Sequence, residues 1–184
     1  MFRQIQIGKI ILLLVVMILI SGVPAIAQDK RGIDSDVKAA LKSLYRTTPS
    51  AKTVGGKAKA ILVFPKIVKA GFIGGVQYGE GALIQDNKIV GYYNIAAASY
   101  GLQAGIQSFG YAMFFMTDSA LQSLNDSAGF EIGTGPSIVV VDAGKARTLT
   151  TTTLRKDVYA FIFGQKGLMA GFGLQGSKIS RIGP

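Results

Sequence analysis

The sequence predicts a single α+β domain, made mainly of antiparallel β-sheet in a sandwich or a partly closed barrel, with an amphipathic helix near its amino terminus. Short apolar or alternating runs recur between turn residues, which is typical of strands. One early segment repeats apolar residues at helical spacing. Glycine is abundant, at 24 of 184 residues, and it favours turns, bulges and strand bends over helix interiors. No low-complexity linker divides the chain, so we expect one domain.

The helix is expected to begin near Asp34, Ser35 and Asp36, whose side chains suit an N-cap, and to end before Pro49. Its apolar stripe comprises Val37, Ala40, Leu41, Leu44 and Tyr45. A second stripe, at four-residue spacing, carries Lys38, Lys42 and Arg46. Two interpretations stay open: a basic amphipathic helix that lies on an anionic membrane surface, and a helix that packs on its own domain with solvated lysines.

Strands are expected through the rest of the chain. Residues 60–64 form an apolar run that Pro65 should stop, and Val76 to Ile84 alternate, with a hairpin turn at Asp86 and Asn87 leading into residues 88–93. Further strands are expected at residues 95–108, 111–116, 137–141, 148–153, 158–163 and 168–179. Asp118 and Ser119 should cap a short helix near residues 118–125. Three segments of the form Gly-apolar-x-small-Gly begin at residues 71, 101 and 167 and indicate strand bends or close strand approach.

Residues 1–27 have the pattern of a secretory signal peptide. Arg3 and Lys9 give a positive start, residues 10–20 are apolar without a break, and Ala25 and Ala27 precede the expected cleavage site. The apolar run is short for a bilayer, which needs about 20 residues, so we favour cleavage over an uncleaved anchor. We expect a mature domain of residues 28–184 that is exported to the periplasm or outer envelope, or secreted. No cysteine follows the leader for a lipoprotein anchor.

The residue types argue against an enzyme. The chain has no cysteine and no histidine, which excludes thiolate or imidazole metal sites and a Ser-His-Asp triad. Residues 171–176 match G-x-G-x-x-G but lack the acidic residue about 20 positions later that a dinucleotide site requires. A Glu80–Glu131 pair could serve acid–base chemistry, although nothing in the spacing favours it, and an oxygen-only cation site stays open. We expect no catalytic residue, no cofactor and no metal.

Positive charge is concentrated near the start of the expected mature chain. The net charge is +10, and residues 30–69 hold ten bases but only two acids. Segregated charge predicts an exposed basic patch that attracts anions. Nucleic acid is a poor candidate partner, because no recognised nucleic-acid-binding pattern is present. We expect one contiguous lipid-binding patch made of Lys38, Lys42, Arg46, Lys52, Lys57, Lys59, Lys66 and Lys69.

Three ordered motifs resemble the SYLF lipid-binding domain family, also described as the yeast actin-binding domain family. They are residues 57–72 (KAKAILVFPKIVKAGF), 99–108 (SYGLQAGIQS) and 159–176 (YAFIFGQKGLMAGFGLQG). The resemblance covers about residues 37 to 180, with departures at residues 91–96, where the family often has Trp-Ser-x-Pro, and at 133–137, where it has an acidic segment. It implies binding of membrane lipid, phosphoinositides in eukaryotic members, through a basic amino-terminal helix, with actin binding in some fungal members.

The leading hypothesis is therefore non-catalytic binding of anionic phospholipid or a membrane surface in the cell envelope. No actin partner is expected in that compartment. The alternatives are a structural or self-associating β-rich envelope protein, favoured by the glycine repeats and apolar strands, and a carboxylate-dependent hydrolase.

Overall fold

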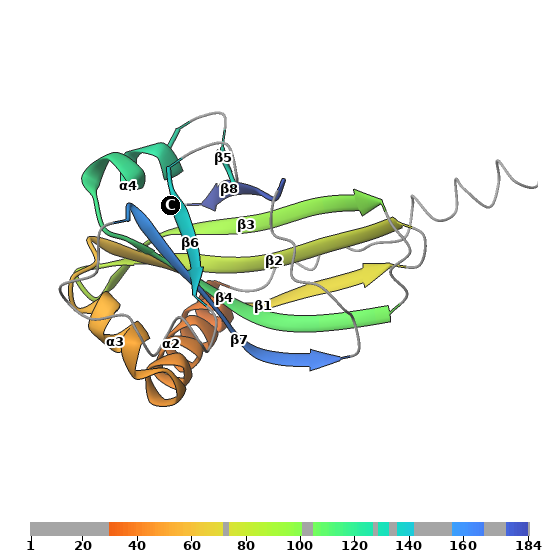
Figure 1. The fold of residues 1–184 in the computed structure, drawn as a ribbon, viewed down its shortest axis with the longest axis horizontal. Helices are drawn as coiled ribbons and strands as arrows, with labels where there is room; N and C mark the ends of the chain where they lie inside the picture. Colours follow the sequence, from red (N-terminus) through yellow and green to blue (C-terminus); the bar gives the residue numbers. More distant parts are fainter. Residues whose placement is uncertain are drawn as a thin grey trace, which may run out of the picture.

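The computed structural model describes residues 30–71, 74–100, 105–126, 129–132, 136–141, 156–167 and 176–183. In these residues one curled sheet carries helices on both of its faces (Figure 1). The helices are α2 (Lys30–Thr47), α3 (Pro49–Gly55) and α4 (Asp118–Leu124). The strands are β1 (Ala60–Gly71), β2 (Gly74–Gln85), β3 (Lys88–Tyr100), β4 (Gly105–Phe115), β5 (Phe130–Glu131), β6 (Ile138–Val141), β7 (Val158–Gly167) and β8 (Lys178–Gly183). The predicted α+β class is confirmed.

The strands lie in the order β5-β8-β3-β2-β1-β4-β7-β6. Neighbours pair antiparallel, as predicted, except for β6, which runs parallel to β7. The predicted β2–β3 hairpin is confirmed: Asp86 and Asn87 have φ values of 50° and 61°. Two consecutive residues with positive φ are typical of a type I′ turn, whose twist matches that of the strands it joins.

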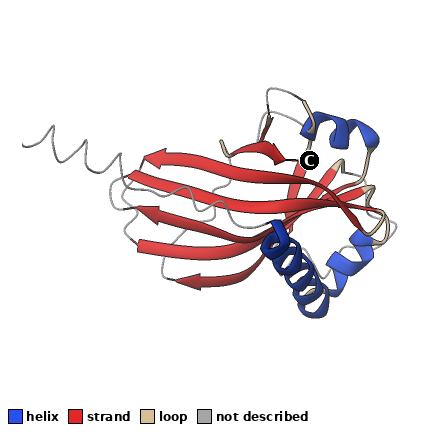
Figure 2. Ribbon diagram, turned by 180° about the vertical axis from the view of Figure 1, so that it is seen from behind, coloured by secondary structure: helices blue, strands red, loops and turns tan. Residues whose placement is uncertain are grey.

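The sheet is apolar on both faces, and each face has its own core. Side chains alternate along β1, so Ile61 and Val63 pack with α2 and α3, whereas Leu62 and Phe64 pack with α4. We call these two sides the α2 face and the α4 face. Figure 2 shows α2 and α3 beside one end of the strands, with α4 across the sheet from them.

The apolar stripe of α2 faces this core. Val37 and Leu44 are buried, and Ala40, Leu41 and Tyr45 pack against them while partly exposed. The apolar stripe therefore packs on its own domain, as the second interpretation expects, while the basic stripe stays exposed. The helix begins earlier than predicted, at Lys30, so the expected N-cap at residues 34–36 is wrong. Those residues lie within the helix, and Asp34 accepts a 2.9 Å hydrogen bond from the Tyr92 hydroxyl on β3.

Pro49 ends α2, as predicted, but it also opens α3 as one of that helix's first residues. Proline fits there because the first amides of a helix have no intrahelical acceptor. The short helix α3 was not predicted. The predicted helix near residue 118 is confirmed as α4, but the expected cap at Asp118 and Ser119 is wrong. The N-cap is Thr117, whose hydroxyl accepts a hydrogen bond from the Ala120 amide.

The prediction that Pro65 stops the first strand is wrong. β1 continues to Gly71, and its register with β2 and β4 shifts around Pro65. Such a bulge accommodates a residue that has no amide hydrogen to donate to the ladder. The continuation matters for the predicted site, because it places Lys66 and Lys69 in a strand.

The remaining strand predictions agree in part. The strand expected over residues 95–108 is two strands, since β3 ends at Tyr100 and β4 begins at Gly105. The strands expected near residues 137–141 and 158–163 are confirmed as β6 and β7. The leader, the strand expected at residues 148–153, and most of residues 168–179 lie outside the described residues.

Candidate functional site

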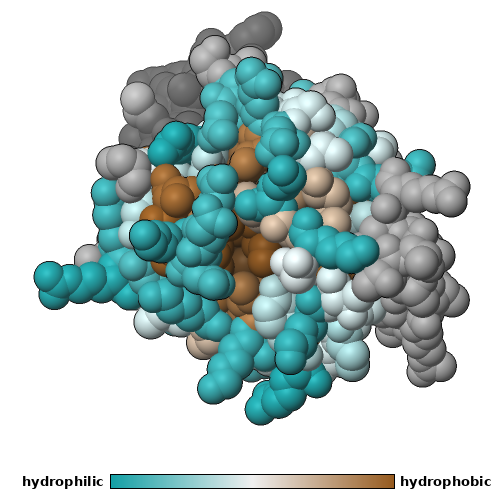
Figure 3. All heavy atoms as spheres, turned by 90° about the vertical axis from the view of Figure 1, so that its left-hand side faces the viewer, coloured by the Kyte–Doolittle hydropathy of each residue, from teal (hydrophilic) through white to brown (hydrophobic). Residues whose placement is uncertain are grey.

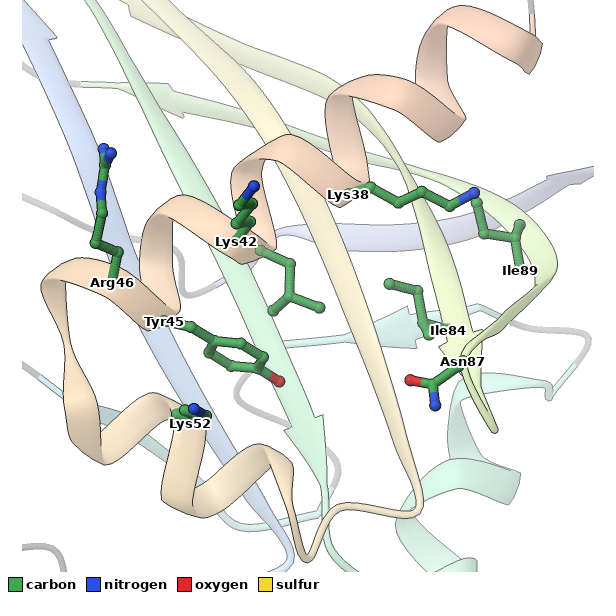
Figure 4. Close-up of a pocket in the computed structure, with 9 residues that line it drawn as sticks. Lys38, Lys42, Tyr45, Arg46, Lys52, Ile84, Asn87 and Ile89 are labelled. Atoms are coloured by element: carbon green, nitrogen blue, oxygen red, sulfur yellow. The ribbon is translucent and has the colours of Figure 1, made fainter.

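A hollow of about 550 Å³ opens between α2, α3 and the β2–β3 hairpin (Figure 4). Its lining combines four cationic residues with an apolar floor, and it includes no acidic residue. The lining residues are Lys38, Leu41, Lys42, Tyr45, Arg46, Lys52, Ile84, Asn87 and Ile89. Figure 3 shows this end of the molecule, where hydrophilic side chains surround a patch of hydrophobic surface.

The helix geometry explains this composition. Residues four apart lie on one stripe of a helix, so Lys38, Lys42 and Arg46 share the exposed side of α2. Leu41 and Tyr45 lie at the border between this stripe and the buried one, and each is partly exposed. Figure 4 shows the Tyr45 ring projecting toward the hairpin, whereas Arg46 points away from it.

The electrostatics of the hollow favour anions. The three α2 cations and Lys52 on α3 are all exposed, so their charges keep most of their hydration while their fields add over one surface. Burial raises the pKa of Tyr45 above its ordinary value of 10.0. The phenol therefore stays neutral at physiological pH and adds no negative charge to the hollow.

The other four predicted residues do not join this surface. Lys57 and Lys59 lie between α3 and β1, and the Lys59 ammonium forms a 3.1 Å ion pair with Asp118. Lys66 is exposed on the α2 face of β1, but Lys69 is only 6% exposed and points to the α4 face. The expectation of one contiguous patch is thus corrected. Residues three apart in a strand point to opposite sides of the sheet.

Sequence reasoning missed part of the site. Ile84, Asn87 and Ile89 reach the hollow because the β2–β3 hairpin ends beside α2. The Asp86–Asn87 turn predicted the hairpin, but no local pattern shows which helix a hairpin will contact.

The structure separates the two carboxylates, Glu80 and Glu131, that the sequence offered as an acid–base pair. The Glu80 carboxylate accepts a 2.7 Å hydrogen bond from the Tyr78 hydroxyl. Glu131 lies on β5, three strand positions away from β2, which corresponds to about 14 Å and is too far for a shared acid–base role. Among the described residues, no three acidic side chains gather as a metal site would require. Within the same residues, no helix has the length and hydrophobicity needed to cross a membrane.

A model of a known protein family matches part of the chain. The family model described as "Ysc84: Las17-binding protein actin regulator" matches residues 96–182, from within β3 through most of β8. The basic side chains of the hollow precede the matched region. No curated protein matches the chain. The matched family is one of binding modules, and two of the three motifs noted above, residues 99–108 and 159–176, fall wholly inside the match. Residues 96–182 therefore match the Ysc84 family, which is the SYLF family that the sequence motifs resemble.

Proposed function

We propose that this protein binds anionic phospholipid at a membrane surface of the cell envelope, through the hollow between α2, α3 and the β2–β3 hairpin. The observation that carries the proposal is the combination of four exposed cations with an apolar floor and no acidic residue in one concave surface. Phosphate groups would contact the lysines, and part of an acyl chain would cover Leu41, Ile84 and Ile89.

The mode of binding is peripheral. The apolar stripe of α2 is already occupied by the core of the domain, so the helix cannot bury that stripe in lipid. Each cation close to an anionic bilayer contributes about 1 kcal/mol. Four of them give about 4 kcal/mol, which corresponds to a Kd near 1 mM. The apolar floor must therefore contribute to any tighter binding, so both features of the hollow belong to the proposal.

We expect the purified protein to sediment with phosphatidylglycerol vesicles and not with phosphatidylcholine vesicles. Binding should weaken steeply between 0.1 M and 1 M salt, since the Debye length falls from about 10 Å to about 3 Å over that range. Co-sedimentation across a salt series measures this. Equal binding to both vesicle types, or binding insensitive to salt, would contradict an electrostatic contact.

We also propose export, on the basis of the leader pattern in residues 1–27. Expression of the full chain in a bacterial host, followed by fractionation and amino-terminal sequencing, should give a mature chain that begins at Gln28 in the envelope fraction. An intact Met1 in the cytoplasmic fraction would overturn this localisation. The description of the family names actin regulation, but an exported chain would not meet actin, so we favour lipid as the ligand.

Self-association is a second candidate function, favoured by one feature. Beyond the end of α2, the α2 face of the sheet exposes Val76 at 65% and Ile106 at 70%. Both flank Ala70 on β1, so they form a continuous apolar surface that a second copy could cover. Sedimentation velocity without lipid should then show dimers that the double substitution Val76→Lys and Ile106→Lys converts to monomers. Monomers of the unmodified protein at all concentrations would exclude this candidate.

A further inference from the structure

A row of polar side chains crosses the α4 face of the sheet at the end of the strands distant from the hollow. Lys69 on β1 is the direct cross-strand partner of Gln77 on β2 and of Gln107 on β4. Direct partners project to the same side of a sheet, with Cβ atoms about 5 Å apart. Three adjacent strands therefore present an amide, an ammonium and an amide side by side.

The neighbouring rows define the surroundings of this polar row. On the inner side lie the apolar residues Ile67 and Phe109, with Gly79 between Ile67 and Ile95. On the outer side, toward the strand ends, the corresponding positions are Gly75, Gly71 and Gly105. Glycine contributes no side chain, so among the described residues of β1, β2 and β4 the row of Gln77, Lys69 and Gln107 holds the last side chains on this face.

These polar side chains are deeply buried. The exposed fraction is 6% for Lys69, 5% for Gln77, 3% for Gln107 and 0% for Ser177. The Gln77 side-chain amide donates a 2.6 Å hydrogen bond to the Ser177 hydroxyl, which fixes the orientation of both groups. The Gln107 carbonyl oxygen is buried without a hydrogen-bond partner. A polar atom left in that state costs free energy in the folded protein.

Among the described residues, the row carries one positive charge and no negative charge. A buried ammonium is stable only when a counter-charge and hydrogen-bond acceptors compensate for its lost hydration. No acidic residue occupies this row or either neighbouring row of the described strands. The row is instead rich in donors, from the Lys69 ammonium, the two glutamine amides and the Ser177 hydroxyl. The oxygen and nitrogen of the Gln107 amide can exchange places by rotation, so that group can also turn its donors to a ligand.

We propose that Lys69, Gln77, Gln107 and Ser177 form a binding site for an oxyanion, specifically a phosphate group, either free or in a lipid headgroup. The site is separate from the hollow. Ile84 and Gln77 are seven residues apart on β2, which corresponds to about 23 Å, and their side chains lie on opposite faces of the sheet. The site does not depend on the function proposed for the hollow.

Isothermal titration calorimetry of the purified protein tests the site with two probes: inorganic phosphate, and a short-chain phosphatidylglycerol below its micelle concentration. Chloride at matched ionic strength is the blank. Lys69→Met keeps the side-chain length and removes the charge, and we expect it to weaken binding at least tenfold. Lys66→Met is the matched control, because it removes the same charge from an exposed position on the same strand. It should leave the affinity unchanged.

A second variant keeps the test decisive if Lys69→Met does not fold. Gln107→Glu places a carboxylate opposite Lys69 and should mimic the bound anion, raising the Tm without phosphate and abolishing the further rise that phosphate produces. Unchanged affinity in folded Lys69→Met, no binding of either probe, or a normal phosphate response in Gln107→Glu would each overturn the proposal.

The two probes distinguish the source of the phosphate group. If both probes bind with equal affinity, a free phosphate is sufficient as the ligand. If only the lipid binds, the ligand is a lipid headgroup. Either result supports the site. A variant with Lys38, Lys42 and Arg46 reversed to glutamate should keep the Lys69-dependent affinity. The experiments can therefore disprove ligand binding at the hollow and ligand binding at this site independently of each other.

Discussion

Replacing Lys38, Lys42 and Arg46 together by glutamate is expected to abolish binding to phosphatidylglycerol vesicles without unfolding the protein. All three side chains are exposed on α2 and line the hollow. At about 1 kcal/mol per charge, losing three attractions and adding three repulsions costs about 6 kcal/mol near the membrane. Salt screening reduces this, so we expect binding weakened by at least 100-fold in co-sedimentation at 0.1 M salt.

A variant with the same change in net charge provides the control. Lys156, Lys166 and Lys178 are exposed and lie outside the lining of the hollow. Their replacement by glutamate should weaken binding only through the overall charge, by much less than the α2 variant. Equal losses in the two variants would show that net charge alone governs binding, and the hollow would lose its role. Far-UV circular dichroism checks that both remain folded.

Gly81→Ala is expected to destabilise the domain by about 3 kcal/mol, the range in which overpacking of a filled core lies. Gly81 is on β2, at the position where β1 bulges around Pro65. A Cβ atom there would overlap the Val63 carbonyl oxygen and approach a ring carbon of Phe64 to 2.8 Å. Both neighbours are fully buried, and the carbonyl is backbone, so neither can move without disturbing the bulge. Urea unfolding measures the loss.

Gly56→Ala is the matched control for this substitution. Gly56 has φ −67° and ψ −11° in the C-cap of α3, a conformation that alanine adopts freely. The nearest atoms to an added Cβ are backbone oxygens at 3.7 Å, which is ordinary contact. The free energy of unfolding of Gly56→Ala should equal that of the unmodified protein or rise slightly, because alanine restricts the unfolded chain. If both variants unfold at the same urea concentration, the inference that the bulge of β1 packs too closely against Gly81 to admit a Cβ atom is wrong.

The sequence predicted those parts of the fold that depend on local periodicity. The apolar stripe from Val37 to Tyr45 identified the helix, and Asp86 with Asn87 identified the hairpin, because each signal lies within a few residues of the structure it forms. The continuation of β1 beyond Pro65 was missed. A proline ends most strands, and only the pairing with β2 and β4 shows that this one lies in a bulge.

In the candidate site, too, the sequence predicted only the features that depend on local periodicity. Helical spacing brought Lys38, Lys42 and Arg46 together correctly. The positions of Lys66 and Lys69 depended on strand alternation that the sequence did not reveal, so the two were assigned to one surface although they point to opposite sides of the sheet. The apolar floor from Ile84 and Ile89 depends on contacts between distant parts of the chain, which no local pattern contains.

The strand order has a consequence for how the chain reaches this structure. β1 is formed by the earliest strand residues, yet it lies between β2 and β4, while β3 has its second neighbour only in β8 at the far end of the sequence. Until residues 178–183 have been made, one side of β3 has no partner strand there. Pairing between strands that are distant in sequence slows folding. An unpaired strand edge can also form hydrogen bonds with other chains. A chain truncated before β8 should therefore aggregate rather than persist as a smaller folded domain.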